Sequence, residues 1–232
     1  MNLKAVLFDL YGTLAYVRDP IGSEEISAFL LAHGYGVYPQ SLDAASHYVG
    51  MIDYPKHGYD SWKTYLKQVL FRLDIEVNVK TLEELTMIYQ QRRTLTLFSD
   101  AVPAVRKAKE LSLRTAIVTT IARFCFYPAI KPFQQYFDVI TTGYEVGCEK
   151  SNPKMHKQTL ERLEVKPSQA VMIGDELLVD IRIPKKLGMY TIFLDRGNKT
   201  SGKPSEADVK ATTLTEALNI VENWIEEISP IG

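Results

Sequence analysis

Five short apolar runs in this chain lack the apolar–polar alternation of a strand that has one face in water. They span residues 3–10, 113–120, 137–142, 170–176 and 190–196. Runs of this kind are typical of strands that are buried on both faces, as in parallel sheets covered by helices. Helical patterns lie between or after these runs, at residues 100–112, 152–164, 177–188 and 212–228. The alternation predicts an α/β fold with a doubly wound, mostly parallel, Rossmann-like sheet.

The predicted helices carry end signals in the sequence. We expect Asp100 and Asn152 to cap two of them, with Pro103 in the first turn of the helix that follows Asp100. Pro184 should kink or restart the helix at 177–188, and Gly188 is a suitable residue for its C-terminal end.

Residues 15–95 break the alternation, because no confident strand is found there. Four helical patterns occupy the segment, at residues 23–34, 41–52, 59–73 and 81–93. We expect a separate, all-helical domain over 15–95, inserted into an α/β core made of 1–14 and 96–232. Its aromatic residues should mostly pack in its interior, while a minority line a pocket. They are Tyr38, Tyr48, Tyr54, Tyr59, Trp62, Tyr65 and Tyr89. Residues 196–208, rich in Gly, Ser and Lys, predict a flexible loop.

Charge and composition narrow the class of partner. The net charge is −1 with acids and bases interspersed, so nothing favours nucleic acid or an anionic membrane, and a small molecule is the expected partner. No apolar span is long enough to cross a bilayer, and the first apolar run is too short for a secretory signal, which predicts a cytoplasmic protein. Cys125 and Cys148 form no CxxC pair and are expected to be free thiols. Oligomeric state is left open.

Polar and charged residues stand where the predicted strands end. They are Asp9, Tyr11, Gly12, Thr13, Thr119, Thr120, Lys150, Asp175, Glu176 and Asp180. Ligands of an open α/β sheet bind at the carboxyl ends of its strands, so these residues should converge on one crevice. Four carboxylates there cannot all stay ionised unless a cation or the Lys150 ammonium compensates them. Oxygen ligands of this kind suit Mg²⁺.

Four stretches then resemble the four motifs of the haloacid dehalogenase superfamily. They are "DLYGTL", "VTT", "EKSNPKMH" and "GDELLVDIRIPKKLGMYTIFLDRG". The resemblance covers the first strand and nearly everything from residue 97 to about 217. The helical insertion matches in position and kind the cap that many members insert after motif one.

The resemblance implies a role for each of these residues. Asp9 would be the nucleophile of a covalent aspartyl intermediate that water later opens. Thr13 and Thr119 would hydrogen-bond the transferring group, and Lys150 would offset negative charge. Mg²⁺ would be held by Asp9, Asp175, Asp180 and the backbone carbonyl of Tyr11. The residues assigned to substrate binding are Tyr11, Gly12 and Thr120.

Tyr11 narrows the expected chemistry. In the phosphatases of the superfamily this position carries a second aspartate, which protonates the leaving oxygen and then activates water. Such general acid–base help is typically worth a factor of ~10² to 10⁴, and a phenol with a pKa of ~10 supplies it poorly at neutral pH. We therefore expect Mg²⁺-dependent hydrolysis of a small phosphorylated compound with a good leaving group, such as an acyl or aryl phosphate.

Two alternatives remain open. "D-x-Y-G-T" is also the form of motif one in the 2-haloacid dehalogenases, where the aspartate would attack carbon and displace halide without a metal. Against this reading, the chain keeps the acids of "GDELLVD", and the surroundings of Arg18 do not resemble a halide-binding site. The other alternative is a protein of this fold that has lost efficient catalysis and binds a ligand or partner through its cap.

Overall fold

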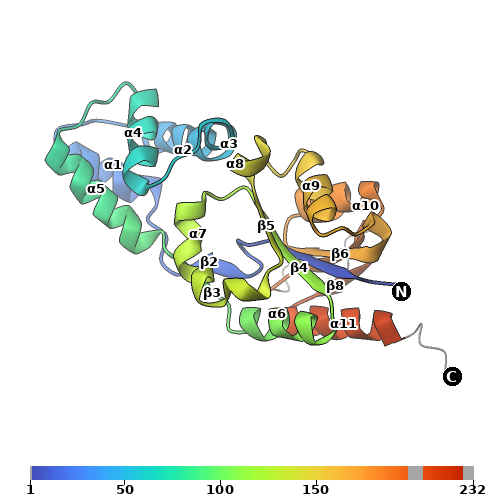
Figure 1. Cartoon of the computed structure of the whole chain (residues 1–232). Helices are drawn as coiled ribbons and strands as arrows, with labels where there is room; N and C mark the ends of the chain where they lie inside the picture. Colours follow the sequence, from blue (N-terminus) through green and yellow to red (C-terminus); the bar gives the residue numbers. More distant parts are fainter. Residues whose placement is uncertain (1, 198–205, 227–232) are drawn as a thin grey trace.

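The computed structural model describes residues 2–197 and 206–226, and a six-stranded parallel sheet forms its centre (Figure 1). In sheet order, the strands are β5 (Val139–Thr142), β4 (Arg114–Thr119), β1 (Ala5–Phe8), β6 (Ala170–Gly174), β7 (Tyr190–Leu194) and β8 (Val209–Ala211). Each neighbouring pair is parallel. Since β4 and β6 lie on opposite sides of β1, the chain reverses its winding direction at β1, which is where open α/β sheets place their ligands.

Both faces of the sheet are covered by helices. Val6 and Phe8 of β1 belong to a core cluster that includes α6 (Ala101–Glu110), α7 (Arg123–Ile130) and α11 (Leu214–Glu226). Figure 1 shows α6 and α11 side by side along the bottom of the view. The alternate residues Ala5 and Leu7 belong to a second cluster, with α9 (Lys154–Arg162) and α8 (Gly143–Val146). The four residues of β1 are all fully buried, which explains its uninterrupted apolar sequence and confirms the predicted fold class.

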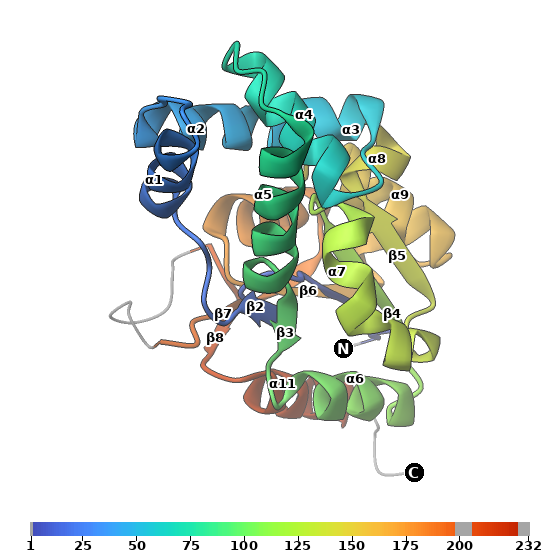
Figure 2. The same ribbon diagram turned by 90° about the vertical axis from the view of Figure 1, so that its left-hand side faces the viewer.

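Residues between β2 and β3 form helices with a core of their own. The helices are α1 (Ser23–Ala32), α2 (Pro39–His47), α3 (Tyr54–His57), α4 (Trp62–Arg72) and α5 (Val79–Arg92), and a π-helical turn (Tyr48–Asp53) joins α2 to α3. Ile26, Leu30, Leu66 and Leu85 are almost fully buried in this third cluster. In Figure 2 α1 to α4 lie in the upper part of the view, and α5 runs down from them toward β3.

Short strands in the connections were not expected from the sequence. β2 (Ala15–Val17) and β3 (Leu95–Leu97) pair antiparallel, with Ala15 opposite Leu97, where the sequence analysis found no strand. Three-residue strands are too short to show periodicity, and this pairing joins segments that are far apart in the sequence. β8, α7 and α8 were also not predicted, because they are short and lie in the connections between the predicted elements. The division of the chain into domains at residues 15 and 95 stays a prediction.

The predicted helix ends are partly correct. After a π-helical turn (Leu177–Arg182), α10 (Ile183–Leu187) starts beside Pro184 and ends at Gly188, whose φ is +90°. The N-cap residue of α9 is Pro153 and not Asn152, although the Asn152 side chain accepts a hydrogen bond from the backbone N–H of Lys154 (3.0 Å), the first residue of α9. The Asp100 side chain, by contrast, makes no cap hydrogen bond to α6, because Arg196 and the N–H of Leu214 bind it instead.

The remaining expectations concern the loop, the thiols and membranes. Most of the loop predicted at 196–208 lies outside the described residues. Cys125 and Cys148 are free thiols, as predicted. In the described ranges no helix has the length and apolarity to cross a membrane. The cellular location stays a prediction.

Candidate active site

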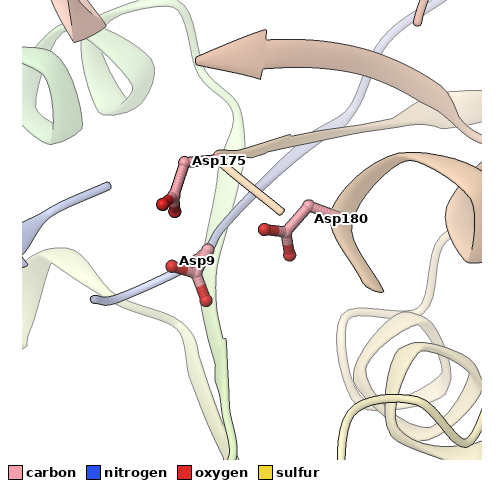
Figure 3. A group of neighbouring side chains, drawn as sticks. All are labelled: Asp9, Asp175 and Asp180. Atoms are coloured by element: carbon pink, nitrogen blue, oxygen red, sulfur yellow. The ribbon is translucent and has the colours of Figure 1, made fainter. Parts of the chain in front are cut away.

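Three aspartates converge at the carboxyl end of the sheet (Figure 3). Asp9 directly follows β1, Asp175 directly follows β6, and Asp180 lies in the π-helical turn after β6. One carboxylate oxygen from each lies within 4.8 Å of those from the other two. From the sequence, four acids were expected to meet here. Glu176, the fourth, is exposed and does not belong to this cluster of three.

Two glycines allow the carboxylates to come so close. Gly12 has a φ of +86°, and a Cβ placed on it would lie 2.6 Å from Cγ of Asp175. A Cβ on Gly174 would lie 2.6 Å from Cβ of Asp180. Real atoms do not approach that closely, so any side chain at either position would push a carboxylate out of place. Gly12, which the sequence analysis assigned to substrate binding, therefore makes room for Asp175.

Lys150 supplies the positive charge at the centre of this cluster. Its ammonium group contacts Oδ1 of Asp9 and lies 2.5 Å from Oδ1 of Asp180. Lys150 is 5% exposed and Asp180 is fully buried. Burial by itself would lower the pKa of Lys150, but the charges of Asp180 and Asp9 outweigh burial and raise the pKa above its ordinary value. The lysine therefore keeps its proton, as a counter-charge to two carboxylates.

The charges of the cluster favour the binding of a further cation. Burial, with a further contribution from the charge of Asp9, raises the pKa of Asp175 to about 6, although the hydroxyl of Thr13 opposes this shift. The charge of Asp9 contributes to the raised pKa of Asp175 more than the charge of Lys150 opposes it, so Lys150 alone does not neutralise the three carboxylates. Because the donors are all carboxylate oxygens, the site fits a hard divalent cation such as Mg²⁺.

The threonines at the strand ends mostly bind protein groups. Thr13 is fully buried and its hydroxyl donates to Oδ1 of Asp175 (3.1 Å), so the geometry favours orientation of Asp175 over contact with substrate. The hydroxyl oxygen of Thr119 accepts from the N–H of Ile121 (3.2 Å). That of Thr120 accepts from the N–H of Lys150 (3.1 Å) and so ties the lysine's loop to the end of β4.

An open cavity of about 390 Å³ lies over these groups. Asp9, Lys150 and Asp175 line it, together with Thr119 and Thr120. Its other lining residues include Tyr11, Met51, Glu176 and Val179. Tyr11 is 48% exposed, and its backbone makes an isolated bridge with Ala15. The predicted residues thus surround a space that a small molecule can enter, except for Gly12, Thr13 and Asp180, which do not line it.

Several residues of this region had no predicted role. Arg196 donates to the backbone carbonyl of Thr13 (2.7 Å) and forms an ion pair with Asp100 (2.8 Å), which fixes the loop after Asp9. Arg196 belongs to the quoted "FLDRG" stretch, but an arginine after a strand gives no sign of its partner. His156, on α9, is fully buried. Burial, together with the charge of Lys150, lowers its pKa to about 3, so it is neutral.

The fold and this site define a class: an α/β enzyme with a carboxylate at the end of its central strand, opposite a lysine and two further acids. Within that class, residues 3–188 match the haloacid dehalogenase-like hydrolases, and the chain belongs to this family.

Individual relatives agree with this assignment. The chain is 25% identical over 216 residues to a glyceraldehyde 3-phosphate phosphatase of Methanopyrus kandleri, covering 89% of this chain and 90% of that protein. Among solved structures, it resembles a HAD phosphatase from Thermococcus onnurineus, with a TM-score of 0.61, 28% identity, and coverage of 94% of this chain and 98% of that one. A 2-haloacid dehalogenase from Pseudomonas syringae gives a TM-score of 0.70 at 18% identity, covering 96% and 99%, a likeness that shows the fold alone.

Proposed function

We propose that this protein is a Mg²⁺-dependent phosphatase of a small phosphorylated compound. The observation that carries the proposal is the cluster of Asp9, Asp175 and Asp180, two of them paired with the Lys150 ammonium group, beside a cavity that Asp9, Lys150 and Asp175 line. Phosphoryl transfer needs little more than positioning and neutralisation of charge, and this arrangement offers both. The phosphatase named among the relatives and the phosphatase of known structure support the same reaction.

The residues suggest how the reaction divides into two steps. A carboxylate oxygen of Asp9 attacks phosphorus, the bond from phosphorus to the leaving oxygen breaks, and an aspartyl phosphate forms. Water then attacks phosphorus, which releases inorganic phosphate and restores the carboxylate. Lys150 holds Asp9 in place and offsets the negative charge that gathers during both steps. Thr13 orients Asp175.

Magnesium would bind between Asp9, Asp175 and Asp180, where it would neutralise the charge of the transferring phosphoryl group. The fit rests on a cluster of three carboxylates in which the one ammonium group, that of Lys150, pairs with only Asp9 and Asp180. Protonation of Asp175, whose pKa is raised to about 6, would compete with the metal, so binding should weaken below that pH.

The leaving group should be one that departs without a proton. Tyr11 stands at the position where the phosphatases of the family carry an aspartate, and it lines the cavity with a half-exposed phenol. A phenol is a weak acid at neutral pH, so alkyl phosphates should react slowly, and acyl or aryl phosphates faster.

The test compares three reactions of the purified protein. We expect hydrolysis of 4-nitrophenyl phosphate in Mg²⁺ that stops on addition of EDTA and in Asp9→Asn. Asp74→Asn is the matched control, because Asp74 has a φ of +57°, a conformation that Asn also tolerates, and it lies outside the site. Hydrolysis that survives EDTA or the loss of the Asp9 carboxylate would contradict the proposal.

A 2-haloacid dehalogenase is the second candidate, because Tyr11 is typical of motif one in those enzymes. Release of chloride from L-2-chloropropionate, unaffected by EDTA, would support it. The cluster of Asp9, Asp175 and Asp180 weighs against this candidate, since without a cation it would repel the carboxylate of a haloacid.

A further inference from the structure

A second cavity opens beside the active site, between the helices of the insertion and the core. Its volume is about 270 Å³. Aromatic side chains from both sides dominate its lining, and we call it the aromatic chamber; they are Tyr54, Trp62, Tyr65, Tyr89 and Phe124. Trp62 of α4 and Phe124 of α7 meet edge to face, with ring centroids 5.2 Å apart. The chamber and the active-site cavity share Met51, Thr120 and Ile121, so a molecule held at Asp9 borders both.

Arg93 is the only charged residue that lines the aromatic chamber in the part of the chain that the structure describes. Its Nη2 donates to the carbonyl of Ile21 (2.8 Å), and its guanidinium carbon lies 5.6 Å from the centroid of the Tyr89 ring. Its Nε is buried and has no hydrogen-bond partner. No carboxylate of residues 2–197 or 206–226 forms an ion pair with it. A buried charged donor without a partner is costly, and in native proteins it calls for an explanation.

The neighbouring arginine, unlike Arg93, has ion-pair partners. Arg92, one residue earlier, forms ion pairs with Glu25 (2.6 Å) and Asp19 (3.1 Å) at the outer surface. The same end of α5 therefore carries one arginine whose charge is matched by the protein and one whose charge faces an apolar cavity. An anionic ligand in the chamber would match the charge of Arg93.

The chamber favours a flat ligand that carries one negative charge. Burial raises the pKa of Tyr65 to about 12, and burial also raises the pKa of Cys125, so neither adds charge at neutral pH. One guanidinium is matched by one carboxylate, which accepts two parallel hydrogen bonds from its planar fork. A phosphate dianion would leave excess charge among aromatic rings. Those rings favour a flat, apolar group, which can stack against them.

We propose that the aromatic chamber binds the leaving group of the substrate, a flat apolar alcohol or phenol that ends in one carboxylate held by Arg93. The inference rests on the proposed phosphatase function, since it places the ester oxygen at Asp9 and the rest of the molecule in the chamber. It assigns specificity to Arg93 at the end of α5, and it names the class of substrate as a phosphate monoester of a carboxylated aromatic or similarly flat compound.

The first experiment compares 4-carboxyphenyl phosphate with phenyl phosphate in the presence of Mg²⁺. Arg93→Gln should lower the ratio of their kcat/KM values by about 10- to 100-fold, the range expected for loss of a charge-assisted hydrogen bond. Differences in leaving-group reactivity cancel, because the same two esters are used with each protein. Arg92→Gln should keep the ratio within about twofold. An unchanged ratio in Arg93→Gln would overturn the proposal.

A second measurement does not depend on turnover. Isothermal titration with 4-hydroxybenzoate, the product of the first ester, should show binding to the wild-type protein that weakens at least tenfold in Arg93→Gln. If aryl phosphates are not hydrolysed but this binding is found, the proposed function fails and the chamber assignment stands. If hydrolysis occurs but 4-hydroxybenzoate binds both proteins equally, or neither, the chamber assignment fails.

A variant that keeps the arginine covers the case in which Arg93→Gln does not fold. A Cβ on Gly50 would lie 3.9 Å from the Tyr65 ring, an ordinary contact, so Gly50→Leu fills the chamber without a clash at its base. It should weaken 4-hydroxybenzoate binding at least tenfold. Full retention of binding in a folded Gly50→Leu protein would show that the ligand lies elsewhere.

Discussion

The ammonium nitrogen of Lys150 lies 2.5 Å from Oδ1 of Asp180, a carboxylate that is completely buried. Neither group would be stable there without the other, because each would be an isolated charge in the protein interior. The pair lies behind Asp9, whose Oδ1 contacts the same ammonium group. The nucleophile that we propose is thus positioned by an ion pair that also contributes to the stability of the fold.

Loss of this ammonium group should affect stability as well as activity. Lys150→Met leaves Asp9 and Asp180 without their shared counter-charge, and we expect a free energy of unfolding lower by about 3–5 kcal/mol, with phosphatase activity lost. Lys63→Met is the control, because the pair of Lys63 and Glu83 is exposed and should be worth at most about 1 kcal/mol. Urea unfolding of both variants checks the prediction. A loss in Lys150→Met no larger than in the control would contradict it.

The glycine after Tyr11 should tolerate no side chain. Gly12→Ala combines a positive φ with a clash against Asp175, whereas Gly34→Ala has a similar φ of +90° and no atom within 4 Å of its Cβ. We expect the control to lose about 1–2 kcal/mol of stability, the cost of the left-handed conformation. Gly12→Ala should lose more and should also lose Mg²⁺-induced stabilisation in a thermal melt. Equal losses in the two variants would show that Asp175 can move aside freely.

The raised pKa of Asp175 predicts how stability depends on pH without metal. Its pKa is about 6 in the folded protein against an ordinary value of 3.8, so the folded state binds the proton more tightly than the unfolded chain. The resulting stabilisation is fully present below pH 3.8 and is lost as the pH rises through 6. Asp175→Asn avoids this loss, so in EDTA it should be more stable than wild type at pH 7.5 and gain little at pH 4.

Magnesium provides the control for that measurement. Bound at the three carboxylates, it should raise the melting temperature of the wild-type protein at pH 7.5 and leave Asp175→Asn nearly unchanged. A variant that gains no stability at pH 7.5 in EDTA, or that responds to Mg²⁺ as wild type does, would rule out strain at Asp175.

His156 should make the protein sensitive to acid. Its pKa is lowered to about 3, chiefly by burial. In the unfolded chain His156 therefore binds a proton near pH 6.5, whereas in the folded protein it stays neutral at that pH. The stability that this contributes is present above pH 6.5 and is lost as the pH falls toward 3. His156→Leu removes the effect. Between pH 6 and 4 the unfolding free energy of this variant should therefore fall less steeply than that of wild type, and the two slopes should differ by up to about 1.4 kcal/mol per pH unit. Parallel pH profiles would contradict this.

Tyr11 provides the test of leaving-group preference. Tyr11→Asp introduces the carboxyl group of the family's phosphatases, and we expect kcat on an alkyl phosphate such as glycerol 2-phosphate to rise at least tenfold, toward the ~10² to 10⁴ typical of general acid–base help. Tyr11→Asn, which has a similar shape but no proton to give, is the control and should show no rise. A rise in both variants would point to relief of crowding rather than to proton transfer.

Much of the fold was predictable because burial on both faces leaves a direct trace in the sequence. β1 and β6 are uninterrupted apolar runs, β4 has an apolar centre, and the ends of these strands carry the acids and hydroxyls that meet at one edge of the sheet. β2 and β3 leave no such trace, because three residues do not make a period and their pairing is decided by chain segments far apart.

The sequence predicted where functional side chains lie better than it predicted which groups they bind. Asp100 has the sequence context of a helix cap, yet its carboxylate binds Arg196, because the tertiary fold brings a guanidinium and the N–H of Leu214 to it. Thr13 lies beside the nucleophile in the sequence, yet its hydroxyl turns inward to Asp175, which comes from another strand.

The residues alone were enough to predict a parallel sheet, an inserted set of helices and a carboxylate site with one lysine, since hydrophobic period and strand-end position are local properties. The tertiary structure alone showed that Gly12 and Gly174 make room for two carboxylates and that Lys150 pairs with two of the three aspartates. It also showed that Arg93 lines an aromatic chamber and has no ion-pair partner among the described residues. Those facts depend on distances between residues remote in the chain, and such distances exist only after the core has packed.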